Sequence, residues 1–205
     1  MEEMYLTYIL IGFTVLVSIN AFNNSTLKSK LIFNAARTYH GKEWYRLFSS
    51  GLIHADILHL VMNMYVLYIF GQPSEFLYEH YGIPGGRWMF VLMYVLALGA
   101  SSVYSMYKFK DMPHYNALGA SGGTSAVIMS FVLLSPMAEY MAGIPMVVVG
   151  IGYIAYSQYA SKHAKDNIGH DAHFWGGVFG FIFPLVLKPS LFADVFLKQI
   201  SLWFA

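Results

Sequence analysis

Two short sequences about fifty residues apart combine a nucleophile with a base inside apolar stretches. They are Gly119-Ala120-Ser121-Gly122 and Ala172-His173-Phe174-Trp175-Gly176. An imidazole can take the proton of a serine hydroxyl and so activate it for acyl transfer. Because ionisable residues within membrane segments are functional candidates by default, Ser121 and His173 predict chemistry performed inside a bilayer.

The composition independently indicates a membrane protein. Hydrophobic residues make up 57% of the 205 residues, charged residues only 11%, and the mean hydropathy is +0.51. Soluble domains carry about 25% charged residues. A net charge of +1 without a basic, aromatic-interleaved run gives no reason to expect a nucleic-acid partner. The absence of cysteine excludes disulfides, cysteine-ligated metal and thiol catalysis.

Six apolar segments are separated by polar or breaker residues, and most approach the ~20 residues that cross a bilayer. They cover residues 4–22, 52–70, 88–107, 118–135, 144–161 and 173–187. Gly71-Gln72-Pro73 is interpreted as the stop signal of the second segment. The first segment follows Glu2 and Glu3 rather than a basic region, which indicates a retained helix. We expect an all-α, multi-pass membrane protein with a single domain over residues 1–205.

Two further stretches are amphipathic and rich in aromatic residues. Residues 23–50 mix five basic side chains with apolar ones, and residues 189–205 carry leucines and aromatics on a segment too short to span. Such sequences are typical of structure that lies in the membrane interface. We expect an interfacial first loop and an interfacial tail.

The fourth segment places Ser121 at the start of a short helix. From Ser121 to Ser135 a helix covers only ~22 Å, less than the ~30 Å hydrocarbon core, so one end is recessed. A helix N-terminus offers free N–H groups to a developing oxyanion. Gly119 and Gly122 allow close approach, although small residues beside a serine are also the usual packing face of membrane helices.

The last segment carries a matching small-residue face. His173, Gly176 and Gly180 follow helical spacing and lie on one face, which suits close packing against the glycine-rich start of the fourth segment. That packing would bring His173 beside Ser121 as general base. The alternative is an ordinary interfacial histidine beside His170.

Further polar residues stand at the start of the second segment. His59 and Asn63 are four apart, share one helix face and can donate hydrogen bonds to an oxyanion. The alternative is a metal site built from the polar side chains near the second and last segments, namely His54, Asp56 and His59 or His170 and His173. Because no His-Glu-x-x-His motif or third ligand spacing occurs, we expect neither metal nor cofactor.

Taken together, these motifs resemble the rhomboid family of intramembrane serine proteases across essentially the whole chain. The resemblance is carried by Tyr45-Arg46, His54, His59, Asn63, Phe70-Gly71, Glu75, Gly119-x-Ser121-Gly122 and Ala172-His173-x-x-Gly176-x-x-x-Gly180. It implies a six-transmembrane-helix rhomboid bundle that cleaves transmembrane protein substrates in the lipid bilayer with a Ser/His dyad. It also implies a multi-pass location, which we expect to be the bacterial inner (cell) membrane.

The resemblance assigns a role to each matching position. Ser121 would be the nucleophile and His173 the general base, while the Ser121 backbone N–H, His59 and Asn63 would hold the oxyanion. His54 would order the entry to the site. Arg46 would belong to the membrane-embedded first loop. The resemblance also suggests the fifth segment, residues 144–161, as a mobile wall for substrate entry.

Two positions depart from the family pattern. The family often has Trp-Arg where this chain has Tyr45-Arg46, with Trp44 one step earlier. Many members carry an aromatic residue four positions after the serine that supports the histidine ring, and that position is Ser125 here.

The sequence also bears on two rival functions and on the orientation in the membrane. A catalytically silent rhomboid-like protein that binds membrane clients would be expected to lack Ser121 or His173, and a small transporter would show broken or charged midplane helices.

The family topology places the N-terminus in the cytoplasm. The positive-inside rule favours the reverse, because nine of the twelve basic residues lie on the expected mouth side, at positions 28, 30, 37, 42, 46, 108, 110, 162 and 165.

Overall fold

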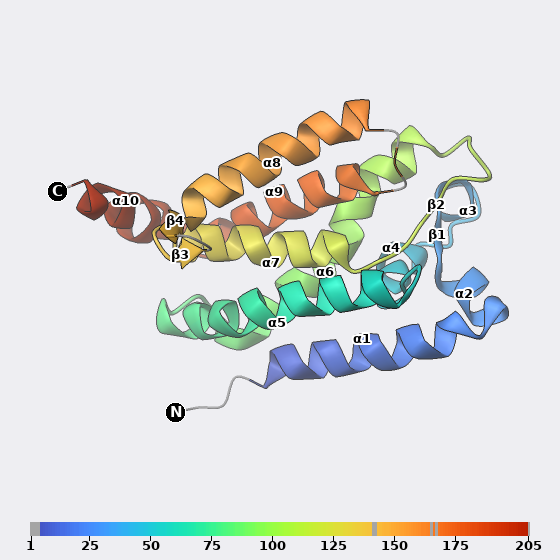
Figure 1. Cartoon of the computed structure of the whole chain (residues 1–205), viewed down its shortest axis with the longest axis horizontal. Helices are drawn as coiled ribbons and strands as arrows, with labels where there is room; N and C mark the ends of the chain where they lie inside the picture. The colour runs from blue at the N-terminus through green and yellow to red at the C-terminus, as the bar shows by residue number, and fades with distance from the viewer. Residues whose placement is uncertain (1–4, 141–142, 165, 167, 205) are drawn as a thin grey trace.

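The computed structural model describes residues 5–140, 143–164, 166 and 168–204 as a bundle of helices (Figure 1). The long helices lie side by side, and the short elements gather at the two ends of the bundle (Figure 1). The long helices are α1 (Leu6–Phe22), α5 (Ile57–His80), α6 (Gly86–Lys108), α7 (Ser121–Leu134), α8 (Met146–His163) and α9 (His170–Leu187). A predominantly helical fold was predicted from the apolar segments, and the structure agrees.

Helix α5 corrects the predicted second segment at both ends. It begins at Ile57 rather than residue 52, because the Asp56 side chain accepts a hydrogen bond from the His59 N–H and caps the helix. It also runs ten residues past Phe70, so the prediction that Gly71-Gln72-Pro73 ends the helix is wrong. A helix enclosed by neighbours tolerates the one hydrogen bond that Pro73 removes.

The extension of α5 is held by a buried carboxylate. Glu75 is fully buried and accepts hydrogen bonds from the backbone N–H groups of Leu6 and Thr7 and from the Thr7 hydroxyl, at 2.9 to 3.2 Å. These are unpaired donors at the start of α1, where a negative charge is favourable. The contact fixes α1 against α5 and explains why the chain stays helical beyond Pro73.

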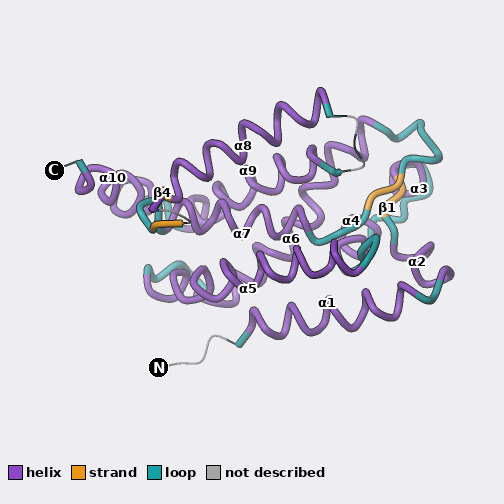
Figure 2. Tube along the Cα trace, in the orientation of Figure 1, coloured by secondary structure: helices purple, strands orange, loops and turns teal. Residues whose placement is uncertain are grey.

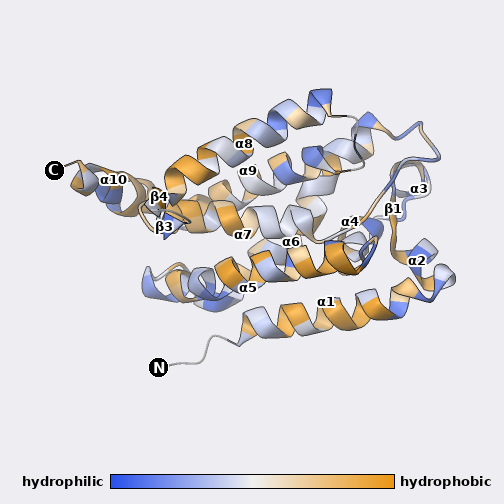
Figure 3. Cartoon of the chain, viewed as in Figure 1, coloured by the Kyte–Doolittle hydropathy of each residue, from blue (hydrophilic) through white to orange (hydrophobic). Residues whose placement is uncertain are grey.

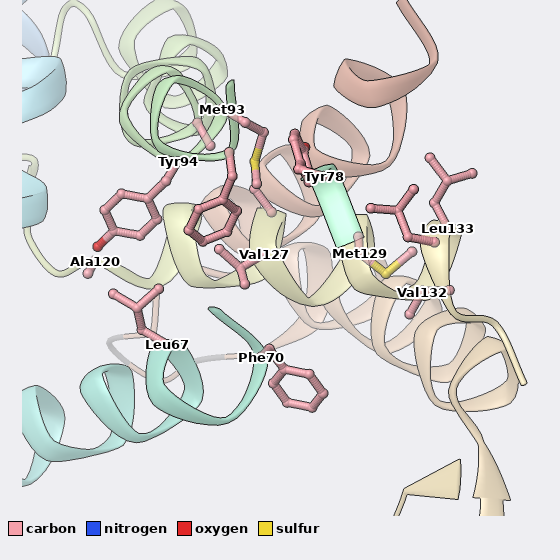
Figure 4. Packing of buried hydrophobic residues seen from close by; sticks show 14 of the residues in the cluster. Leu67, Phe70, Tyr78, Met93, Tyr94, Ala120, Val127, Met129, Val132 and Leu133 are labelled. Atoms are coloured by element: carbon pink, nitrogen blue, oxygen red, sulfur yellow. The ribbon is translucent and has the colours of Figure 1, made fainter. Parts of the chain in front are cut away.

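Helix α7 forms the centre of the bundle. Eleven of its fourteen residues are buried, and α5, α6, α8 and α9 all contact it. Val127, Met129 and Leu133 of α7 belong to the same core cluster as Leu67 of α5 and Met93 of α6, and Figure 4 shows these side chains arranged along α7. A helix that is enclosed on nearly every side is rigidly positioned. Its N-terminus is therefore a well-defined point in the fold.

The outer surface of the bundle is apolar. Large exposed hydrophobic side chains recur along α1, α5 and α8. In Figure 3, α1 and the first halves of α5 and α8 are largely orange. Among the helices that the structure describes, α6 is the one that is long and apolar enough to cross a membrane. The number of candidate spans rises to at most three if each of two sharply bent helix pairs is counted as one span. Six spans stay a prediction. Helix α7 covers only about 21 Å at about 1.5 Å per residue.

The predicted first loop contains short, regular elements. These are α2 (Ser25–Leu31), β1 (Phe33–Asn34), α3 (Ala35–Tyr39), α4 (Arg46–Ser49) and the 3₁₀ turn η1 (Ser50–Leu52). Strand β1 pairs antiparallel with β2 (Asn116–Ala117), with Phe33 opposite Ala117 (Figure 2). The sequence had not predicted this pairing. It ties the first loop to the segment that leads into α7.

The C-terminal tail folds against the opposite end of the bundle. A π-helix, η3 (Phe192–Leu197), continues into α10 (Lys198–Trp203), at 110° to α9. Lys188 Nζ donates to the Tyr81 carbonyl at 2.6 Å, and Gln199 Nε2 donates to the Leu134 carbonyl at the end of α7 at 3.2 Å. A second small hairpin, β3 (Glu139–Tyr140) with β4 (Ile144–Pro145), lies beside it. The interfacial location of the tail stays a prediction.

Candidate active site

Ser121 is the first residue of α7, as predicted, and is half-buried at the end of the bundle where the first loop lies (Figure 1). The chain reaches it through Gly119, whose φ of +117° disfavours any other residue. A Cβ at Gly119 would also lie 2.6 Å from Cε1 of His59. The Gly119 N–H donates to the Ser50 carbonyl at 3.0 Å. The residue two positions before Ser121 is therefore held between Ser50 and the His59 ring.

A chain of three hydrogen bonds runs through His54. The Ala120 N–H donates to His54 Nε2 at 3.2 Å, so the proton must be on Nδ1, which donates to Ser18 Oγ at 2.9 Å. The Ser18 hydroxyl donates in turn to the Leu52 carbonyl at 2.8 Å. The sequence expectation was that His54 orders the entry to the site. The structure places it directly against the residue preceding Ser121.

His173 lies in the first turn of α9, which begins three residues earlier than predicted, at His170. Glycines bring α9 against α7: a Cβ at Gly176 would overlap the carbonyl oxygen of Gly122, and one at Gly180 would overlap the carbonyl oxygen of Ala126. Backbones approach this closely only where both helices present small residues. The residue after Ser121 is thus packed against the turn that follows His173.

The two proposed dyad residues stand in the first turns of two helices that pack together, α7 and α9. Among the described residues, no hydrogen bond joins the Ser121 hydroxyl to the His173 ring. Catalytic hydrogen bonds are often loose in the free enzyme and shorten when substrate binds. The first turns of α7 and α9 therefore carry a hydroxyl and an imidazole, the two groups that nucleophilic catalysis combines.

Three groups near Ser121 could donate to an oxyanion. The Ser121 N–H belongs to the first turn of α7, where backbone donors have no partner within the helix. The His59 ring lies against Gly119. Asn63 is buried, with its amide donating to the His59 carbonyl at 2.9 Å and its oxygen accepting from the Thr124 hydroxyl at 3.3 Å. Asn63 keeps a second amide hydrogen for a ligand.

The support of the His173 ring comes from a residue that sequence reasoning missed. Tyr153 of α8 stacks on His173, with the ring centroids 6.4 Å apart and the planes at 22°. Its hydroxyl lies 2.5 Å from Ser125 Oγ, and Ser125 Oγ donates to the Ser121 carbonyl at 2.6 Å. Ser125 occupies the position of the family's aromatic residue, and Tyr153 supplies a ring from another helix. No local motif around Tyr153 signals this contact, because it depends on how α8 packs.

Arg46 organises the first loop at a distance from these groups. Its side chain is fully buried and donates to Glu43 at 2.5 Å and to the carbonyls of Ser29 and Ile32 at 2.9 and 2.7 Å. The Arg46 hydrogen bond holds the pKa of Glu43 below its usual value of 4.5, and Arg37 adds to the effect. The structure therefore places Arg46 in the scaffold of the loop, away from bond-making chemistry.

The alternative metal sites lack a third ligand. Within the described ranges, no three histidine or acidic side chains gather as metal ligands would. His170 Nε2 lies 3.2 Å from both carboxylate oxygens of Asp166. The Ile168 N–H and then His170 lower the pKa of Asp166. The His170 ring is thus paired with the Asp166 carboxylate. The rings of His54 and His59 contact each other edge to face, with their centroids 5.0 Å apart.

Comparison with known proteins places these features in a family. The chain is 27% identical over 188 residues to RHOMBOID-like protein 12, mitochondrial, of Arabidopsis thaliana, covering 85% of this chain and 55% of that protein. It is 28% identical over 137 residues to Rhomboid protease GluP of Bacillus subtilis, covering 67% and 25%. It is also 24% identical over 169 residues to Inactive rhomboid-related protein 2 of Caenorhabditis elegans, covering 77% and 45%.

The chain spans about half the length of the Arabidopsis and Caenorhabditis relatives and a quarter of the Bacillus one. The family model for the rhomboid domain matches residues 41–190, which include every predicted site residue. Because that match covers more than half of this chain, the chain belongs to the rhomboid family.

Proposed function

We propose that this protein is an intramembrane serine protease that hydrolyses peptide bonds of transmembrane protein substrates. The observation that supports the proposal is the close, glycine-mediated approach of α7 to α9, two helices that carry Ser121 and His173 in their first turns. The family relation supports it, since one relative is a protease by name. Another relative is named inactive, so activity has to be measured.

The proposed reaction is acyl transfer through a covalent intermediate. The Ser121 oxygen attacks the carbonyl carbon of the scissile peptide while His173 takes its proton as general base. His173 then gives the proton to the departing amine as the C–N bond breaks, which leaves an ester on Ser121. Water attacks this ester, His173 again accepts a proton, and the free serine is restored.

The negative charge that develops on the substrate oxygen is stabilised at the start of α7. The Ser121 N–H, the His59 ring and the free amide hydrogen of Asn63 are the proposed donors. The Ala55 N–H points at His59 Nδ1 at 3.5 Å, which favours the tautomer with its proton on Nε2. Each preorganised donor of this kind contributes about 100-fold or more in rate.

Water for the second step enters where α7 begins. A helix of about 21 Å leaves one end recessed within a hydrocarbon core of about 30 Å. The starts of α5, α7 and α9 share that end of the bundle (Figure 1). Polar groups at membrane depth are stable there because they face protein or water rather than lipid.

The proposal is tested with purified protein and a panel of single-span membrane substrates. Wild-type protein is expected to cut at least one of them at a defined bond, and Ser121→Ala is expected to cut none. The matched control is Ser201→Ala, on the exposed C-terminal helix α10. Cleavage that persists in Ser121→Ala contradicts the proposal, and binding without cleavage by wild-type protein supports the silent, client-binding alternative.

The membrane arrangement forms part of the proposal. Six helices are taken to cross a bacterial cell membrane, with the N-terminus in the cytoplasm and the start of α7 near the outer surface. The exposed aromatic side chains Trp44, Tyr45 and Phe48 support insertion of the first loop in the interface. Protease accessibility of sealed vesicles tests the orientation, and protection of the loop between α8 and α9 in right-side-out vesicles would contradict it.

A further inference from the structure

The imidazole of His173 makes no hydrogen bond within the described part of the chain. It is half-buried and makes two ring contacts. One is the stack on Tyr153, and the other is an edge contact with His170 at 5.8 Å and 83°. A histidine side chain has two rotatable bonds, so a ring that must face a nearby hydroxyl needs something to stop it from turning.

We propose that Tyr153 is the positioning residue for the general base, which acts by stacking on His173 while Ser125 fixes the tyrosine hydroxyl. This inference rests on the proposed protease function, since it assigns His173 the role of base. Parallel, offset rings at this separation attract each other, and the stack blocks rotation of the imidazole. Tyr153 therefore acts through His173 and does not touch the scissile bond.

The hydrogen-bond directions around Ser125 support this role. Ser125 Oγ gives its hydrogen to the Ser121 carbonyl, so the hydroxyl that lies 2.5 Å away on Tyr153 must donate to Ser125. The series Tyr153 to Ser125 to Ser121 joins the ring on the base to the backbone of the nucleophile. Tyr153 thereby contacts the His173 ring and, through Ser125, is linked to the backbone of Ser121.

The position of Tyr153 in the fold adds a consequence. Ser121 and His173 stand on α7 and α9, whereas Tyr153 stands on α8, at the edge of the bundle (Figure 1). Helix α8 leaves large apolar side chains such as Val148 and Ile151 exposed. The orientation of the base thus depends on a third helix, and loss of the α8 contact disables His173 without moving α7 or α9.

The experiment compares Tyr153→Leu, Tyr153→Phe and a matched control. Tyr159→Leu is that control, because Tyr159 also lies on α8 and stacks on a histidine, His163, at 4.4 Å and 20°, outside the site. We expect Tyr153→Leu to lower kcat at least about tenfold with little change in KM, since only orientation is lost. Tyr153→Phe keeps the ring and is expected to retain most of kcat. Tyr159→Leu is expected to match wild type.

A double-variant comparison tests the Ser125 contact. Ser125→Ala removes the bond to the Tyr153 hydroxyl together with the bond from Ser125 to the Ser121 carbonyl, whereas Tyr153→Phe removes only the former. Adding Tyr153→Phe to Ser125→Ala is therefore expected to lower kcat no further. Independent, multiplicative losses would refute the role of Ser125. Unchanged kcat in Tyr153→Leu, or an equal loss in Tyr153→Phe, would overturn the stacking proposal.

A readout without catalysis separates this inference from the proposed function. Diethyl pyrocarbonate modifies accessible imidazole nitrogens, and mass spectrometry gives the rate at each histidine. Tyr153→Leu is expected to speed modification of His173 several-fold, and Tyr159→Leu to speed that of His163 only. If wild-type protein cuts nothing but these rates shift, the protease proposal fails and the contact stands. If wild-type protein cleaves its substrate and Tyr153→Leu leaves the rate of His173 modification unchanged, the inference about Tyr153 fails.

Discussion

Adding one methyl group at Gly176 is expected to push α9 away from α7 and so separate the proposed dyad. A Cβ there would overlap the carbonyl oxygen of Gly122 and lie 2.9 Å from its carbonyl carbon and its Cα. Carbon atoms prefer about 3.5 Å or more, so the helices must part by at least about 0.6 Å. The obstacle is backbone on a buried helix, which cannot turn aside as a flexible side chain could.

The consequence for Gly176→Ala follows from that displacement. A misplacement of about 1 Å can cost about 100-fold in rate, so we expect kcat/KM to fall between about 10-fold and 100-fold. Overpacking also costs about 1–3 kcal/mol of stability. Turnover of a cleaved substrate and thermal unfolding in the same detergent measure both effects.

The control for Gly176→Ala is Gly152→Ala on α8, where an added Cβ meets nothing within 4 Å. It is expected to leave kcat/KM and thermal stability unchanged. A folded Gly176→Ala protein with wild-type kcat/KM would refute the reasoning, because the spacing of α7 and α9 would then not set the dyad geometry.

Three further predictions address separate parts of the fold and the site. Asn63→Ala should lower kcat by about 100-fold, read from substrate turnover of the folded protein, because an oxyanion donor is lost. It should also cost about 1–3 kcal/mol of stability, because the buried partners of Asn63 lose a hydrogen bond. Unimpaired turnover would exclude the oxyanion role. Glu75→Gln should destabilise the protein by about 1.5–3 kcal/mol, because the charged acceptor for the start of α1 is lost, and unfolding by denaturant measures it. Glu43→Gln should flatten the acid limb of a plot of melting temperature against pH. The lowered pKa of Glu43 gives stability that is present above pH 4.5 and lost as the pH falls through the folded-state pKa, so a wild-type slope in the variant would contradict the prediction.

The parts of the fold that sequence predicts well are those set by local pattern. The apolar runs predict the long helices, and the fourth of them, residues 118–135, contains α7, which begins at Ser121. The spacing of Gly176 and Gly180 predicts a face that approaches a partner closely, and the structure shows that contact. Each of these depends on residues only a few positions apart.

The features that were missed depend on contacts between distant segments. Pro73 reads as a helix stop, but the buried pairing of Glu75 with the start of α1 keeps α5 helical to His80. The pairing of β1 with β2 joins residues some eighty positions apart through two-residue strands. Tyr153 reaches His173 only because α8 packs beside α9, so periodicity within α8 could not reveal it.

Covalent labelling tests most directly whether Ser121 is a nucleophile that His173 activates. Purified protein is treated with a fluorophosphonate, which bonds covalently to activated serine hydroxyls, and the modified residue is identified by mass spectrometry. We expect one adduct, on Ser121, that is absent from His173→Ala and retained in Ser201→Ala. An unmodified Ser121, or an adduct that forms equally fast in His173→Ala, would contradict this expectation.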